Sequence, residues 1–170
     1  MTVFETRRTR VREWRRPDIP ELLAVYGDST VSKYIDDGAP LTPDEAEAWW
    51  HVTQNNYRKR GYGMWTVETT PDATPIGFVG LVHPGGQAVG EVKYAYRPAY
   101  WGQGFATEVL SALCTHVFAT LDTSQIMATV APDNHPSQRV LIKCGFRRVA
   151  DRREDDGTIT RVFHKHYPSF

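Results

Sequence analysis

The sequence predicts an α/β protein in which a central mixed sheet carries helices on its faces. Segments of alternating apolar and polar residues take turns with segments whose apolar residues recur at helical spacing, so strands and helices follow one another along the chain. Hydrophobic residues make up 41% of the chain, which is enough for a core and too much for intrinsic disorder. No segment of about 20 to 50 residues repeats, which argues against solenoids and propellers.

Length and charge narrow the classes of function. The chain has 170 residues, which predicts one domain over residues 1–170. Its 20 Lys and Arg residues balance 20 Asp and Glu residues, whereas proteins that bind bulk nucleic acid carry a basic excess. No apolar run approaches the roughly 20 residues that cross a bilayer, and no signal-peptide core begins the chain. We therefore expect a cytoplasmic protein, a monomer or a homodimer, without nucleic-acid or membrane partners.

The first third of the chain predicts one strand and two helices. Residues 8–14 alternate as a short strand does, and a proline-containing stretch then opens a helix through residues 21–26. A second helix begins at Thr42, because this N-cap, the proline that follows it and Glu45 form a typical helix start. It continues through residues 46–50.

Three strands follow in the middle of the chain. Residues 63–68 and 75–81 flank a turn-rich segment at 70–73, as the strands of a hairpin do. Residues 88–96 read as the third strand, which ends just before a proline. The middle of the chain is therefore expected to form strands of the sheet, with helices before and after it in the sequence.

The second half of the chain begins with a glycine-rich turn at residues 101–108. This turn runs directly into a helix that extends to Phe118, because its apolar residues have helical spacing. A buried-type strand at 126–130, a short helix at 137–143 and a last strand at 161–164 complete the predicted elements.

The glycine-rich turn is the main chemical feature of the sequence. Glycines let the backbone approach a ligand closely, and the first N–H groups of the following helix lack partners within it, so the turn can hold a phosphate. No Gly-Lys-Ser/Thr sequence occurs, which argues against a Walker loop. Thr107 stands where a dinucleotide fingerprint needs its third glycine.

Three separated motifs resemble those of one family. The turn, Trp101-Gly102-Gln103-Gly104-Phe105-Ala106, resembles the [R/Q]-x-x-G-x-[G/A] hallmark of the GNAT N-acetyltransferases. Asn134-His135-Pro136-Ser137 and Cys144-Gly145-Phe146 follow it as in the branch similar to the ribosomal-protein N-terminal (RimJ/RimL-like) acetyltransferases. Residues 6–14 are similar to the first strand of that branch. The resemblance covers nearly the whole chain, and three motifs in order are far more specific than one.

The resemblance implies a GNAT fold, with a mostly antiparallel twisted sheet, that binds acetyl-CoA as the acetyl donor and needs no metal. The strand before the turn would pair through its backbone with the pantetheine arm, and the turn would hold the pyrophosphate. Asn134 and Ser137 would lie beside the pantetheine and the thioester, although both are also good helix caps. The implied cofactor-binding residues are Tyr94, Ala95, Tyr96, Trp101, Gly102, Gln103, Gly104, Phe105, Ala106, Thr107 and Asn134.

Acetyl transfer to an amine needs a base, an oxyanion donor and a proton for the departing thiolate. Glu91 is the expected catalytic base, with a structural ion-paired carboxylate as the alternative. A backbone N–H of residues 94–96 would stabilise the oxyanion. Leu141 stands where many GNAT enzymes have a tyrosine acid, which leaves Ser137, a water or no dedicated acid.

The acceptor is expected to be a primary amine, either a protein N-terminus or a small cationic amine. Residues 17–57 are rich in acidic side chains, which would attract a cationic acceptor. The alternative interpretation is that they form an ordinary solvated helix face. A catalytically silent CoA-binding sensor or interaction module is the alternative function, and a nucleotide-binding regulator is a third. The acids are Asp18, Glu21, Asp28, Asp36, Asp37, Asp44, Glu45 and Glu47.

Other conspicuous residues favour structural roles. Residues 49–50, both tryptophan, are expected to pack on the sheet or at its edge. His164 and His166 have no third ligand nearby, so we expect no metal site. The two cysteines lack zinc-like spacing and are expected to be buried. Arginines near the N-terminus are expected to line an exposed edge strand and discourage aggregation, namely Arg7, Arg8, Arg10, Arg12, Arg15 and Arg16.

Overall fold

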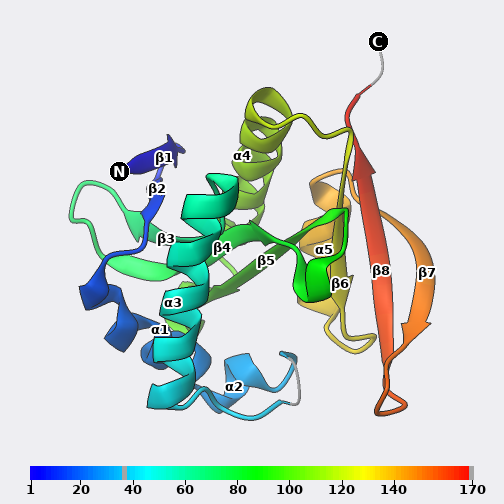
Figure 1. Cartoon of the computed structure of the whole chain (residues 1–170), viewed down its shortest axis with the longest axis horizontal. Coiled ribbons are helices and arrows are strands. Elements are labelled where there is room, and N and C mark those ends of the chain that lie inside the picture. Colours follow the sequence, from blue (N-terminus) through cyan, green and yellow to red (C-terminus); the bar gives the residue numbers. More distant parts are fainter. Residues whose placement is uncertain (36–37, 169–170) are drawn as a thin grey trace.

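The computed structural model describes residues 1–35 and 38–168, whose strands join into one sheet (Figure 1). The strand order is β1-β2-β3-β4-β5-β6-β8-β7. Neighbouring strands are antiparallel except β5 and β6, which are parallel, so the predicted mixed, mostly antiparallel sheet is confirmed. The strands are β1 (Thr2–Glu5), β2 (Thr9–Glu13), β3 (Met64–Thr69), β4 (Pro75–Val82), β5 (Gly90–Tyr96), β6 (Gln125–Val130), β7 (Arg147–Arg153) and β8 (Ile159–His166).

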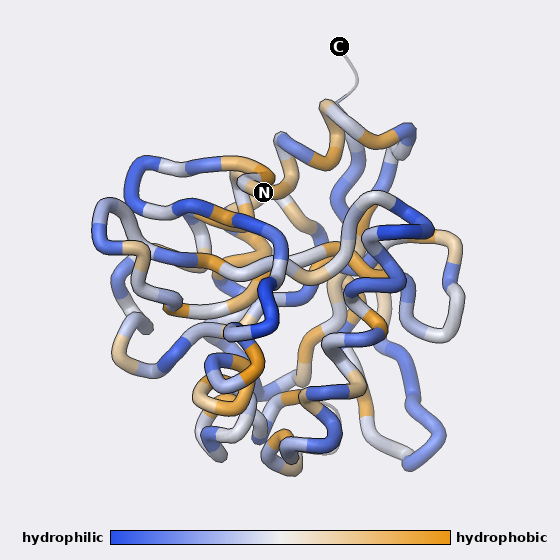
Figure 2. Tube along the Cα trace, turned by 60° about the vertical axis from the view of Figure 1, so that its left-hand side comes forward, coloured by the Kyte–Doolittle hydropathy of each residue, from blue (hydrophilic) through white to orange (hydrophobic). Residues whose placement is uncertain are grey.

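Helices cover both faces of this sheet. On one face, Leu22 of α1 and Ala46 of α3 share a buried cluster with Phe78 of β4. On the other face, Leu110 of α4 belongs to a larger cluster with Val79 of β4. Figure 2 shows that hydrophobic stretches lie mainly inside the molecule while hydrophilic ones occupy outer turns. The helices are α1 (Ile19–Tyr26), α2 (Ser29–Ser32), α3 (Pro43–Arg60), α4 (Phe105–Thr120) and α5 (His135–Lys143), with 3₁₀ turns η1 (Arg16–Asp18), η2 (Pro84–Gly86) and η3 (Pro98–Tyr100).

The parallel pair of strands, β5 and β6, is joined only at its beginning. Gly90 lies opposite Ile126 and Glu91 lies opposite Met127, and over the described residues the ladder ends there although both strands continue. The strands therefore part beyond Glu91. Because β4 pairs with the other edge of β5 from Glu91 to Tyr96, residues 92–96 keep one backbone edge without a strand partner among the described residues.

Several predicted elements have longer bounds in the structure. The helix start at Thr42 is confirmed, since its side chain accepts a hydrogen bond from the Glu45 N–H at 3.3 Å. This helix, α3, extends to Arg60, well beyond the predicted end. Strands β1 and β7 and the short α2 were not predicted.

The prediction that the N-terminal arginines line an exposed edge strand is wrong for Arg12. β1 occupies the edge, so β2 lies between β1 and β3. The Arg12 side chain is buried, with 6% of the residue exposed, and donates to both carboxylate oxygens of Asp18 at 2.8 and 3.0 Å. Its Nε donates to Glu68 at 2.9 Å. This buried ion cluster ties β2, β3 and the start of α1 together.

The other conspicuous side chains are mostly packed. Trp49 meets Tyr26 edge to face, with ring centroids 5.0 Å apart. Both cysteines are free and buried, as predicted, and burial raises the pKa of the Cys114 thiol to about 12. Over the described ranges, no cluster of His, Cys, Asp and Glu is arranged to hold a metal ion. None of the helices in those ranges has both the length and the apolar character needed to cross a bilayer.

Candidate active site

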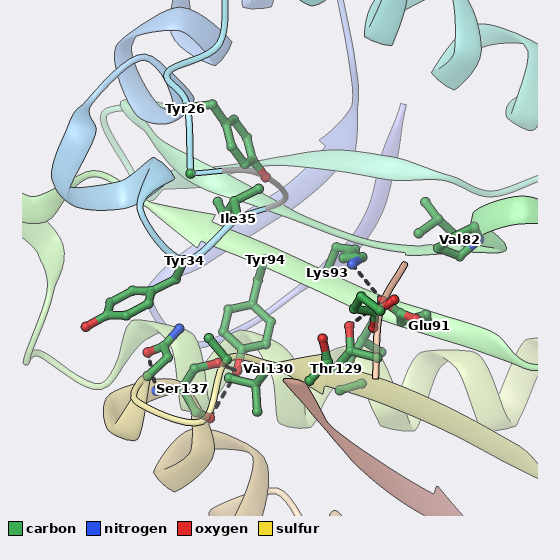
Figure 3. A pocket seen from close by; sticks show the side chains of 18 of the residues that line it. Tyr26, Tyr34, Ile35, Val82, Glu91, Lys93, Tyr94, Thr129, Val130 and Ser137 are labelled. Carbon is green, nitrogen blue, oxygen red and sulfur yellow. Dashed lines mark hydrogen bonds and ion pairs between the residues drawn. The ribbon is translucent and has the colours of Figure 1, made fainter. Parts of the chain in front are cut away.

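A cavity of about 920 Å³ opens where β5 and β6 part (Figure 3). Its walls come from β5, from β6 and the loop after it, and from α5. The helical cover contributes Tyr26, Tyr34 and Trp49, and the β7–β8 hairpin contributes residues 152–160 in part. The cavity therefore lies in the gap between β5 and β6, and residues of both strands form its walls.

Glu91 lies at the point where the strands part and lines this cavity. It is almost completely buried, with 2% of the residue exposed. Its Oε2 lies 2.6 Å from Lys93 Nζ and accepts a hydrogen bond from Thr129 Oγ1 at 2.9 Å. The amide of Gln87 donates to Oε1 at 3.4 Å. The carboxylate is thus ion-paired and also borders the cavity, which combines features of the two alternatives that the sequence left open.

A pair of hydroxyl groups connects β5 with α5. Tyr94 Oη and Ser137 Oγ are 2.8 Å apart, and both residues line the cavity (Figure 3). Burial raises the pKa of the Tyr94 phenol, so it stays protonated at neutral pH. Leu141, which occupies the place of the expected tyrosine acid, also lines the cavity but has no proton to give.

The Tyr94 side chain is the functional group that the sequence did not reveal. The sequence assigned only the backbone of this residue to a site. Because Tyr94 and Ser137 are 43 positions apart, no local spacing could have paired their hydroxyls.

Asn134 is the N-cap of α5 and also lines the cavity. Its Oδ1 accepts a hydrogen bond from the Ser137 N–H at 3.3 Å. The capping role proposed as an alternative is therefore present. The same side chain borders the space between the strands.

The glycine turn follows the carboxyl end of β5. Gly102 and Gly104 have φ of +71° and +82°, a region that favours glycine, and Gly104 is the N-cap of α4. A Cβ on Gly102 would meet no atom within 4 Å, so its backbone faces open space. The Trp101 indole N–H donates to the Tyr96 carbonyl at 2.9 Å and fixes the turn to the end of the strand.

An anchor from the first strands holds the first turn of α4. The Glu108 carboxylate accepts hydrogen bonds from Arg8 Nε at 2.9 Å, from the Arg8 backbone N–H at 3.1 Å and from Thr6 Oγ1 at 2.5 Å. The Arg8 guanidinium also lies over the Phe105 ring, 4.0 Å from its centroid. Burial raises the pKa of Glu108, but the hydrogen bonds from Thr6 and Arg8 outweigh it and lower the pKa overall.

The predicted site residues divide into two groups. Glu91, Tyr94, Asn134 and Ser137 line the one cavity. The backbone of Ala95 and Tyr96 continues along the open edge of β5, while their side chains are buried on opposite faces. The turn residues lie outside the cavity lining and follow β5 directly; they are Trp101, Gly102, Gln103, Gly104, Phe105, Ala106 and Thr107.

The acids of residues 17–57 that the structure describes lie apart from the cavity lining, and their expected attraction of a cationic acceptor stays a prediction. Asp18 is held by Arg12, and Glu47 pairs with Arg16. None of the described acids in this segment lines the cavity, and Asp36 and Asp37 lie outside the described residues. The charged side chains around the cavity are instead Lys33, Glu91, Lys93, Asp133, Arg152, Glu154 and Asp156.

Comparison with known proteins gives one consistent family. A model described as "Acetyltransferase (GNAT) domain" matches residues 8–147. The uncharacterized N-acetyltransferase YnaD of Bacillus subtilis is 28% identical over 143 residues, which cover 84% of this chain and 81% of that protein.

Solved structures with the same fold include relatives that bind coenzyme A. A GNAT-family acetyltransferase from Bacillus anthracis has a TM-score of 0.82 at 22% identity and covers 98% of both chains. RimL, a ribosomal L7/L12 alpha-N-protein acetyltransferase in complex with coenzyme A, has a TM-score of 0.81 at 15% identity, also over 98% of both chains. A Vibrio cholerae spermidine N-acetyltransferase with CoA and spermine has a TM-score of 0.76 at 18% identity, over 93% of this chain and 95% of that one.

Proposed function

The chain belongs to the GNAT acetyltransferase family and is an N-acetyltransferase, and from this premise we propose that it moves the acetyl group of acetyl-CoA to a primary amine by direct attack in a ternary complex. The observation that carries the proposal is the parting of β5 and β6 beside Glu91. This gap offers an unpaired strand edge to an extended ligand and opens into a cavity that contains a carboxylate.

The residues of the gap and the turn suit the donor. The N–H groups at the start of α4 and the open backbone of Gly102 would hold the pyrophosphate. The pantetheine arm would then run from the turn back along residues 92–96. Since the turn follows the carboxyl end of β5, this path brings the acetyl end toward Glu91.

The groups around the cavity can divide the proton transfers between them. Glu91 would accept a proton from the attacking amine, directly or through water. A backbone N–H of residues 94–96 would stabilise the oxyanion. The Tyr94 and Ser137 hydroxyls, which contact each other, would supply the proton to the thiolate as the C–S bond breaks.

The acceptor that we propose is a small cationic amine or a protein N-terminus. Relatives of the same fold include an enzyme for a protein N-terminus and one for spermidine. The carboxylate of Glu91 already pairs with one primary ammonium, that of Lys93, which supports a primary amine as the acceptor. The β7–β8 hairpin borders the cavity with Asp156 and with Glu154, which pairs with Arg152 at 2.8 Å.

A thiol-release assay tests the function directly. The purified chain is incubated with acetyl-CoA and, one at a time, polyamines, amino sugars and short peptides with free N-termini. Release of CoA above the acceptor-free rate, with acetylated product seen by mass spectrometry, is the expected result. Binding of CoA without transfer to any amine would instead indicate the silent CoA-binding module.

Replacing Arg8 by methionine should raise the KM for acetyl-CoA about tenfold, because Arg8 and Glu108 fix the first turn of α4. The KM for S-acetylpantetheine, which lacks the pyrophosphate, should stay within about twofold. Arg8→Lys should recover part of the affinity. Equal losses with both donors would show that Arg8 supports only the fold.

Removing the hydroxyl of Tyr94 with Tyr94→Phe should lower kcat about tenfold, a modest effect because a thiol is already a good leaving group. The KM for acetyl-CoA should change by less than about twofold. Ser137→Ala should lower kcat by a similar factor. In the double variant, the factor by which kcat falls should be no more than about twice the larger single factor, because the two hydroxyls act as one unit. A raised KM with unchanged kcat would mean that the pair only positions the donor.

A further inference from the structure

Lys93 places a primary amine inside the candidate active site. It is two residues after Glu91 on β5, so both side chains lie on the same face of the strand. Its Nζ is 2.6 Å from Glu91 Oε2 (Figure 3). The side chain lines the cavity and is 42% exposed, so it is held at the carboxylate but not packed away.

Lys93 lies at the gap between β5 and β6, where its amine can reach a bound acetyl donor. The ladder between β5 and β6 ends at Glu91, so Lys93 is on the first stretch of β5 that has an open edge. On the proposed function, the acetyl end of the donor reaches this same point. No other described lysine shares this arrangement, since Lys33 also lines the cavity but lies over the Tyr34 ring, with Nζ 4.6 Å from its centroid.

We propose that Lys93 is a self-acetylation site, modified by the chain's own bound acetyl-CoA when no acceptor fills the cavity. This inference rests on the proposed function. Glu91 takes one proton from the Lys93 ammonium, and the freed Nζ lone pair attacks the thioester carbonyl carbon. The N–C bond forms, the C–S bond breaks, and the thiolate takes a proton from the Tyr94–Ser137 pair, which the second proton lost by the nitrogen replaces. The products are acetyl-lysine, the CoA thiol and one proton released to solvent.

The consequence for the site is a change of charge. Acetyl-lysine carries no charge, so modification removes the cation that pairs with Glu91 and places a neutral amide in the cavity. The reaction is intramolecular within the donor complex, which favours it over acetylation of lysines outside the cavity. Such lysines provide internal references: Lys59 at the end of α3 and Lys143 at the end of α5, both exposed.

The test is peptide mass spectrometry of the whole chain after incubation with acetyl-CoA and no acceptor. Acetylation of Lys93 should proceed at least about tenfold faster than that of Lys59 and Lys143, because proximity acts only in the cavity. Glu91→Gln should slow Lys93 acetylation by a similar factor and leave the two exposed lysines unchanged. Lys93→Arg keeps a cation beside Glu91 and should abolish the peptide signal, which confirms its assignment.

Two results would overturn the inference. One is equal acetylation of all three lysines, and the other is a Lys93 rate that stays the same in the heat-unfolded chain. Transfer to external amines is measured in the same wild-type sample. Transfer without acetyl-Lys93 would overturn self-acetylation alone, whereas the absence of both reactions would overturn the proposed function as well.

Discussion

Replacing Arg12 by methionine should lower the free energy of unfolding by about 3–5 kcal/mol, because one partner of a buried ion cluster is removed. The guanidinium gives two hydrogen bonds to Asp18 and one to Glu68, and all three residues are buried. Methionine keeps much of the volume but leaves two carboxylates without their main cation. Urea denaturation, with the midpoint and slope fitted together, measures the loss.

Arg10 provides the matched control for this prediction. It is on the same strand, two residues away, and also pairs with Glu68, at 3.6 Å. Its side chain is 40% exposed, so Arg10→Met should lower the stability far less than Arg12→Met does. Equal losses for the two variants would contradict the role given to the buried cluster.

The pH dependence of stability gives an independent measure of the same cluster. Burial raises the pKa of Asp18, but hydrogen bonds from Arg12 and from the Arg15 N–H outweigh it and hold the pKa below its ordinary value of 3.8. A lowered pKa in the folded state stabilises the fold above the unfolded value, and this contribution is lost as the pH falls below 3.8. In Arg12→Met this acid-dependent part should shrink, so the two proteins should differ less at about pH 3 than at about pH 6.

The parts of the fold that the sequence predicted are those with a local signal. The cap at Thr42 and the glycine turn are determined by residues close together in the chain, and both are present, although α4 begins at Phe105 and so includes the last residues of the turn predicted over 101–108. β7 was missed because every one of its residues is exposed, which leaves no alternation to detect. Arg12 was placed on an exposed edge because the strand that covers it, β1, gives an equally weak pattern.

In the candidate site too, the features that the sequence could predict are those with a local signal. Glu91 could be proposed because it lies on the strand just before the cofactor-binding segment, at a position that is often acidic in the branch that the sequence resembles. Its contact with Lys93 had a detectable signal, since residues two apart on a strand share a face. The Tyr94–Ser137 contact had none, because it depends on how α5 packs beside the gap. The acidic residues of α1 and α3 were given to the acceptor because a count of charges does not show which of them are already paired.

Replacing Glu91 by glutamine should lower kcat by about 10²- to 10⁴-fold, the usual contribution of a general base. Glutamine has nearly the same shape and can still accept the hydrogen bond from Thr129, so the change removes charge and basicity with little loss of packing. The KM for acetyl-CoA should change by less than about threefold, because the donor is held by the turn and by the edge of β5. Glu47→Gln is the control, since this carboxylate is outside the cavity and should leave kcat unchanged.

The nearby Lys93 makes a second variant necessary, because Glu91→Gln also leaves an ammonium without its counter-ion. If this unpaired cation caused the loss, adding Lys93→Met to Glu91→Gln would restore kcat to within about tenfold of the wild type. If Glu91 is the base, the double variant should stay as slow as the single one, because both variants lack the group that accepts the proton. Steady-state rates of the four proteins in this cycle separate the two causes. A restored kcat would mean that Glu91 serves as the structural ion-pair partner of Lys93, which is the alternative role that the sequence left open.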